Sequence, residues 1–198
     1  RSPSRGLGDV YKRQILEAAA KDETQHEFLL SGGVMDALEY ACAHDFSFMS
    51  LSTSAYAAGC LVALVGRNEG GKTLSLAAVS SIVGSLQKYF RADGPFVQAA
   101  VKVVLDSGLS RLQTVAISDA NKRLMLHCDG LIGSLIGCLL LGEGNRRRTQ
   151  DGAEMLQEAA AGTIHELSLF KPWLQALKDD GRAMTSLREV LDVGTTKA

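Results

Sequence analysis

The sequence predicts an all-α fold in which short helical units stack side by side as an α-solenoid. A similar pattern of apolar residues returns about every 45–52 residues, and a period of this length is typical of stacked helical arrays. The apolar positions follow helical spacing rather than the alternation of a strand. Only three prolines interrupt the 198 residues. Because one such unit cannot bury its apolar face alone, we expect the copies to pack against one another.

The repeat is clearest where the last helix of each unit begins. Gly33–Leu38 aligns with Ala78–Val83 and with Gly130–Leu135. In each copy a small residue lets the turn close, the next apolar residue begins a core stripe, and an apolar residue four positions later continues it. The expected copies cover Glu27–His44, Lys72–Phe90, Lys122–Leu141 and, more weakly, Lys171–Asp192.

The expected helices alternate in length as long, short and long. Gly32 and Gly33 end a first short helix over Glu27–Leu30, because glycine tolerates the left-handed geometry of a helix C-terminus. Ser52–Ser54 offers an N-cap for a long apolar helix over Ala55–Val65. Leu109–Ile117 fits either a helix or a packed loop. Further helices are expected over Val34–Ala41, Thr73–Leu76, Val79–Leu86, Phe96–Leu105, Lys122–His127, Leu131–Leu141, Asp151–Ala161 toward Phe170, a short stretch that begins at Pro172, and Met184–Leu191.

This order of elements resembles armadillo-like repeats over residues 27–194. The resemblance is carried by a long helix, a polar turn (Asn68–Gly71 and Asp119–Asn121), a short helix, a small residue and then Val/Leu-x-x-x-Leu/Val. It implies a right-handed α-solenoid of about three to four three-helix repeats over residues 15–198. It also implies a non-enzymatic scaffold that needs no cofactor and binds a protein or peptide on its concave surface.

In armadillo-like arrays the third helix of each unit lines the concave surface. The resemblance therefore implies a ladder of solvent-facing binding residues: Asp36, Glu39, Tyr40, Ser81, Ser85, Lys88, Ser134, Thr185 and Arg188. Receptors for nuclear localisation signals carry Trp and Asn on these helices, and the third helices here carry neither, so recognition of basic nuclear signals is not expected. The ladder mixes both signs of charge, which predicts no strong preference for a basic or an acidic peptide.

An alternative function comes from Gly66–Thr73, which fits the P-loop pattern GxxxxGK[ST]. In a P-loop the glycine-rich backbone cradles phosphates, the lysine reaches the β- and γ-phosphates and the hydroxyl holds Mg²⁺. The chain would then be a nucleotide hydrolase that binds phosphate through Gly66, Gly71, Lys72 and Thr73. Leu61–Val65 would supply the preceding strand and Val101–Asp106 the Walker B strand.

Three observations favour the repeat over the P-loop. Ser54–Leu61 is rich in alanine and helical in pattern, whereas a P-loop follows a strand. The loop also falls on the polar turn of the repeat. Strand signals are scarce elsewhere, although a P-loop domain needs several parallel strands between its helices. Protein binding therefore stays the first hypothesis.

Composition limits the other classes of function. A net charge of −1 gives no field that favours nucleic acid or anionic membranes, and no apolar run approaches the roughly 20 residues that span a bilayer. The four cysteines lie within apolar helical patterns and lack metal-site spacing, which predicts reduced thiols in an intracellular, cytoplasmic protein without a metal. The cysteines are Cys42, Cys60, Cys128 and Cys138. Trp173, close to Phe170 in the sequence, is expected to be a hydrophobic anchor between helices.

Both ends of the chain suggest a piece of a longer protein. Residues 1–14, RSPSRGLGDVYKRQ, resemble a translated sequencing-adaptor tail and are expected to be non-native. Gly194–Ala198 stops where another helix would begin. An array cut between units would expose an apolar end, so poor solubility or self-association is expected.

Overall fold

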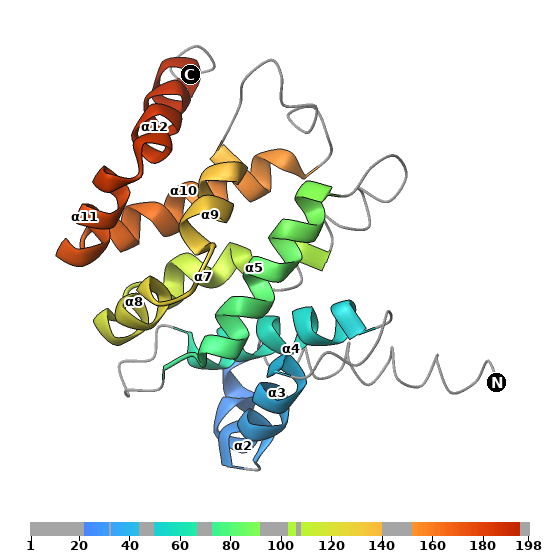
Figure 1. Cartoon of the computed structure of the whole chain (residues 1–198). Helices are drawn as coiled ribbons and strands as arrows, with labels where there is room; N and C mark the ends of the chain where they lie inside the picture. Colours follow the sequence, from blue (N-terminus) through green and yellow to red (C-terminus); the bar gives the residue numbers. More distant parts are fainter. Residues whose placement is uncertain are drawn as a thin grey trace.

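The computed structural model is all-helical over the residues that it describes, which are 22–31, 33–43, 50–66, 73–91, 103–105, 108–139 and 152–194. No strand occurs within these ranges, so the predicted all-α class is confirmed (Figure 1). A 3₁₀ turn over Glu23–Gln25 precedes the first α-helix. The described α-helices are α2 (His26–Ser31), α3 (Val34–Ala43), α4 (Ser50–Val65), α5 (Leu76–Arg91), α7 (Leu109–Val115), α8 (Asp119–Leu126), α9 (Leu131–Leu139), α10 (Ala153–Ser168), α11 (Lys171–Asp179) and α12 (Gly181–Gly194).

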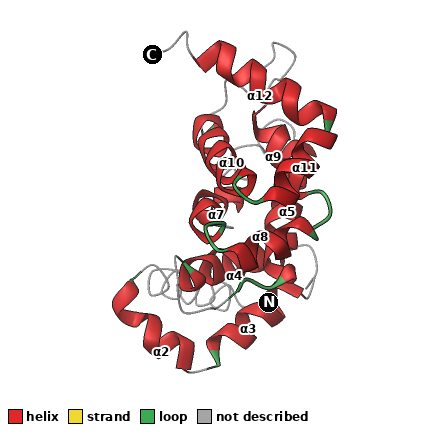
Figure 2. Ribbon diagram, turned by 90° about the vertical axis from the view of Figure 1, so that its left-hand side faces the viewer, coloured by secondary structure: helices red, strands yellow, loops and turns green. Residues whose placement is uncertain are grey.

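The helices pack in two rows. In one row, which we call the α3–α12 row, α3 packs on α5, α5 on α9 and α9 on α12. In the other, the α4–α10 row, α4 packs on α7 and α7 on α10. Figure 2 shows the second row along one side of an elongated molecule that runs from α2 and α3 at one end to α12 at the other. Consecutive members of a row come from successive parts of the sequence.

The core follows the aligned apolar positions of the sequence. Val79 and Leu131 are fully buried, and Leu38, Val83 and Leu135 are buried as well. Burying each of these side chains stabilises the fold by roughly 1.5–3 kcal/mol. The apolar stripe that the repeat predicted is therefore the stripe by which α3, α5 and α9 contact the core.

A glycine lies at a close contact between α7 and α4. Gly108 precedes α7 with a φ of 91°, in the left-handed region. A Cβ at this position would lie 3.1 Å from the Cα of Gly59 and from the Cβ of Val62, both in α4. The first turn of α7 therefore sits directly on the backbone of α4, which only a residue without a side chain permits.

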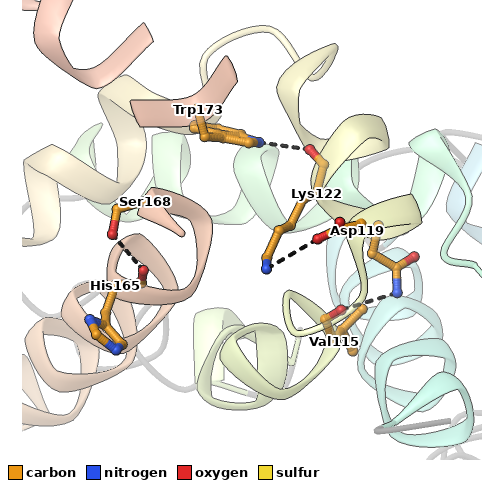
Figure 3. A network of polar contacts seen from close by, with 7 residues as sticks. Val115, Asp119, Lys122, His165, Ser168 and Trp173 are labelled. Carbon is orange, nitrogen blue, oxygen red and sulfur yellow. Dashed lines mark hydrogen bonds and ion pairs between the residues drawn. The ribbon is translucent and has the colours of Figure 1, made fainter. Parts of the chain in front are cut away.

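Two hydrogen bonds tether segments that lie about one repeat apart in the chain. The Asn121 Oδ1 accepts a 2.9 Å bond from the Leu74 N–H, 47 residues away, while the Asn121 Nδ2 donates to the Val115 carbonyl at 3.1 Å. The indole Nε1 of Trp173 donates a 2.7 Å bond to the Lys122 carbonyl, 51 residues away (Figure 3). Trp173 is buried, as expected of an anchor between helices.

Several predicted boundaries differ from the structure. The short helix expected over Thr73–Leu76 is wrong, since Thr73–Ser75 is not helical and α5 begins only at Leu76. The Leu74 N–H bonds to Asn121 instead of to a helical carbonyl, and the Ser75 Oγ accepts a bond from the Ala78 N–H in the first turn of α5. Elsewhere α4 begins at Ser50, earlier than expected, and Leu109–Val115 is a helix.

Some predictions fall on residues that the structure does not describe. The proposed tail over residues 1–14 lies outside the described residues, as do Gly71 and Lys72 of the P-loop pattern. Of the helix expected over Phe96–Leu105, only 103–105 is described, and it is helical.

Candidate functional site

A groove of about 410 Å³ lies between α9 and α12, on the α3–α12 row. We call it the α9–α12 groove. Its size is within the range of about 300–1,000 Å³ that is typical of binding pockets. The residues that line it are Gly133, Ile136, Gly137, Gly181, Arg182, Thr185, Ser186 and Glu189.

The helical period brings these side chains to one groove. On α9, Ile136 and Gly137 lie three and four residues after Gly133, so all three share one face of the helix. On α12, Arg182 lies in the first turn. Thr185, Ser186 and Glu189 follow it by three, four and seven residues, so all four side chains share one face of the helix. Because α9 and α12 pack against each other, the two faces form the walls of a single depression.

The floor of the groove is apolar and partly bare backbone. An added Cβ at Gly133 or Gly181 would meet no atom within 4 Å, so the space above both residues is open. A Cβ at Gly137 would lie 2.8 Å from the Cζ of Phe90, whose ring covers this part of α9 from α5. Ile136 also lines the groove, but its side chain is buried.

Opposite charges stand at the two ends of the groove. The Arg182 side chain is 85% exposed, and its Nε lies 3.9 Å from the Asp180 Oδ1. That carboxylate oxygen also accepts bonds from the N–H groups of Arg182 and Ala183, at 3.0 and 3.2 Å, and so caps the first turn of α12. Glu189, half-buried, lies seven residues further along α12, which is about 10 Å along the helix axis.

The expected ladder of binding residues is only partly reproduced. Thr185 lines the groove, and its Oγ1 donates to the Gly181 carbonyl. Asp36, Tyr40, Lys88 and Arg188 are exposed on α3, α5 and α12 outside the groove, while Glu39 and Ser81 are half-buried.

Two members of the ladder do not face solvent, and their expected exposure is wrong. Ser85 is 2% exposed and Ser134 is 5% exposed. The Ser85 Oγ donates to the Ser81 carbonyl within α5. The reason is that α5 and α9 each have neighbours on both sides in the row, so a wider arc of each helix is buried than a single apolar stripe indicates.

The residues at the ends and floor of the groove were not predicted. Arg182 and Glu189 share a helix face with the predicted Thr185, and Gly133 and Gly137 lie four residues apart, so the helical period carried a signal for both pairs. The sequence does not show which face of α12 meets α9, and this packing is what makes the pairs a site.

At the alternative nucleotide site, the described residues lack the strand that precedes a P-loop. Leu61–Val65 lies within α4, and Val103–Leu105, in the proposed Walker B segment, is helical as well. Gly66 follows the last residue of α4 with a φ of 47°, and Thr73 is exposed. Within the described ranges, no group of three or more His, Cys, Asp or Glu side chains is placed to hold a metal ion.

Burial raises the pKa of three of the four cysteine thiols. None of the four forms a disulfide bond, and burial raises the pKa of Cys42 and of Cys138 to about 12, with the charge of Glu39 adding to the shift at Cys42. Burial also raises the pKa of Cys128, against the opposing effect of a hydrogen bond with Ser80. These three thiols are therefore protonated at neutral pH, and thiolate is the form that acts as a nucleophile.

No described helix is long and apolar enough to cross a membrane. Comparisons of the chain with protein-family models, curated proteins and solved structures found no match. The function is therefore argued from the helix packing and the geometry of the α9–α12 groove.

Proposed function

We propose that the chain is part of an armadillo-like α-solenoid, a non-enzymatic scaffold that binds a protein or peptide partner along the α3–α12 row. The observation that carries this proposal is the packing order: α3, α5, α9 and α12 form one succession and α4, α7 and α10 another. Each helix contacts the next member of its own row. A stacked array has this pattern because every unit contacts only its neighbours.

The tethers support the same interpretation. Asn121 reaches back to Leu74, and Trp173 reaches back to Lys122, in each case over about one repeat. Both bonds join residues within three positions of where the proposed units begin, at Lys72, Lys122 and Lys171, although different main-chain groups are bonded. This regularity favours a repeated unit over an irregular helical domain.

The α9–α12 groove supplies the main contact for a partner. It lies on the row that armadillo-like arrays use for binding, it is lined by apolar atoms and open backbone, and it carries a charge at either end. Pockets that bind ligands have this combination of an apolar interior with a few polar groups that fix orientation.

The test is a selection of binders from a displayed library of random peptides, followed by affinity measurement. Gly133→Leu fills the groove at a position with open space above it, so selected peptides should lose affinity by about tenfold or more. Ser110→Leu is the control, because Ser110 is exposed on α7, which belongs to the α4–α10 row and does not line the groove. Circular dichroism checks that both variants fold.

Two outcomes would overturn the proposal. One is a selection that yields no binder, or binders that are insensitive to Gly133→Leu. The other is tight, Mg²⁺-dependent binding of ATP or GTP that Lys72→Ala abolishes, since this would favour the nucleotide hydrolase.

A further inference from the structure

We infer that the α9–α12 groove receives an amphipathic helix that carries an acidic and a basic side chain seven residues apart, with apolar side chains between them. The inference rests on the proposed function and names the class of its partner. It starts from the two charges of the groove, Arg182 and Glu189, and from the apolar space between them.

The charges set the spacing of the partner. Arg182 and Glu189 are separated by seven residues of α12, or about 10 Å along its axis. A helix that lies alongside α12 presents its own positions i and i+7 at the same separation and on the same face. An acidic residue then stands opposite Arg182 while a basic residue stands opposite Glu189.

An extended peptide does not fit this pattern. It advances about 3.3 Å per residue, so a separation of about 10 Å corresponds to three residues. Residues three apart in an extended chain point to opposite sides, and only one of the two charges would face the groove. A helix, in contrast, directs i, i+3, i+4 and i+7 toward the same surface.

The Arg182 guanidinium stays available to a partner although Asp179 and Asp180 lie just before it in the chain. Asp180 uses its Oδ1 to cap the N–H groups of Arg182 and Ala183, and the same helix N-terminus contributes a partial positive charge. The Arg182 guanidinium is mostly exposed, and its Nε lies only at the limit of an ion pair with Asp180, at 3.9 Å. It can therefore turn toward a partner carboxylate.

The interior of the groove accepts the apolar positions of the helix. Its volume of about 410 Å³ is more than twice that of a cavity of about 150 Å³ that holds a benzene molecule. The absence of side chains at Gly133 and Gly181 leaves this space open, and the surface that lines it is mostly apolar. Two leucines at i+3 and i+4 of the partner would contact this surface.

The test is a matrix of four peptides and three proteins, read by fluorescence anisotropy at low and at physiological salt. The peptides have about 18 residues and blocked ends, carry leucine at i+3 and i+4, and differ only in the residues at i and i+7: Glu and Lys, Lys and Glu, Lys and Lys, or Glu and Glu. The proteins are the natural chain, Arg182→Glu, in which both ends of the groove are acidic, and Glu189→Arg, in which both are basic.

Each protein should prefer the peptide that complements its two charges. The natural chain should bind the mixed peptide best, Arg182→Glu the Lys/Lys peptide and Glu189→Arg the Glu/Glu peptide, each by about tenfold over the mismatched peptides. A mixed peptide with Lys and Glu exchanged should bind the natural chain as well as the original does, because a helix can lie in either direction. Gly133→Leu should weaken every pair.

The inference fails if affinity does not depend on the pairing of charges. It also fails if none of the designed peptides binds while library-selected peptides bind the natural chain and lose affinity for the Gly133→Leu variant. In that second case the groove binds protein and only its partner class is wrong. If neither the designed nor the selected peptides bind, both the inference and the proposed function are overturned.

Discussion

Asn121 is the residue at which three segments of the chain meet. Its side chain is buried, and both of its polar atoms are used, one by the Leu74 N–H and the other by the Val115 carbonyl. A buried amide with both atoms bonded fixes the position of the non-helical stretch before α5 against α8. Without the side chain the buried Leu74 N–H would lose its partner, whereas the Val115 carbonyl would keep the bond that it accepts from the Ser118 N–H at 3.4 Å.

We therefore predict that Asn121→Ala lowers the free energy of unfolding by about 1–3 kcal/mol, the cost of leaving the buried Leu74 N–H unpaired. Urea denaturation followed by circular dichroism measures this. Ser110→Ala, which removes an exposed hydroxyl from α7, is the control and should change stability by less than about 0.5 kcal/mol. Equal effects of the two variants would contradict the assigned role.

The partly buried thiols Cys42 and Cys138 predict a loss of stability at alkaline pH. Both have a pKa of about 12 in the folded protein, against an ordinary value of 9.0. Above about pH 9 the unfolded chain loses these protons while the folded protein keeps them, so the free energy of unfolding falls as pH rises.

The measurement is urea denaturation at about pH 8 and about pH 10.5. The natural chain should lose more stability between these two conditions than Cys42→Ala/Cys138→Ala does, since tyrosine and lysine titrate alike in both proteins. Parallel pH profiles would show that the two thiols titrate normally in the folded state.

At the scale of the element, the crossing of α7 over α4 depends on Gly108. Gly108→Ala introduces a Cβ 3.1 Å from atoms of Gly59 and Val62 and forces alanine into the left-handed region. The backbone cost is about 1–2 kcal/mol, and the overpacking adds to it. We predict a loss of about 2–4 kcal/mol, measured by denaturation.

Gly84→Ala is the matched comparison for this crossing. Gly84 lies within α5 with open space around its added Cβ, so alanine there should stabilise the helix by about 0.5–1 kcal/mol. The two substitutions should thus shift stability in opposite directions. A Gly108→Ala variant as stable as the natural chain would mean that α7 does not lie directly on α4.

The elements also show where prediction from the sequence succeeds. Gly33 and Gly130 marked the beginnings of α3 and α9, because each precedes an apolar stripe at helical spacing. Thr73–Ser75 could not be predicted, since the bond that keeps Leu74 out of a helix comes from Asn121, far away in the chain. The local pattern of apolar residues therefore predicts that a helix forms, but the residue at which α5 begins depends on a contact with Asn121.

The candidate site was predictable to a smaller extent. Thr185 was found because the repeat placed it on the third helix, but Ser85 and Ser134 were misplaced because their burial depends on both neighbours in the row. Arg182 and Glu189 became significant only when the packing of α12 on α9 was known. A site made by two elements requires the angle between them, which a linear pattern does not contain.

At the scale of the whole molecule, the packing by neighbours predicts a gradient of local stability. Among the described helices, α5, α7 and α9 have neighbours on both sides, whereas α2 and α12 lie at the two ends (Figure 2). Native-state hydrogen exchange should therefore find the slowest amides in α5, α7 and α9 and faster exchange in α2 and α12. Uniform protection along the chain would indicate one cooperative core instead.

The hydrogen bonds made by the Asn121 and Trp173 side chains have one further consequence. In each, one segment contributes a side chain, and the other contributes only a main-chain group, the Leu74 N–H or the Lys122 carbonyl. Substitutions other than proline at Leu74 and Lys122 leave these main-chain groups in place, so each bond constrains the sequence of only one of the two segments that it joins. In the repeat array proposed above, a duplicated or exchanged unit would therefore have to bring its own tethering side chain.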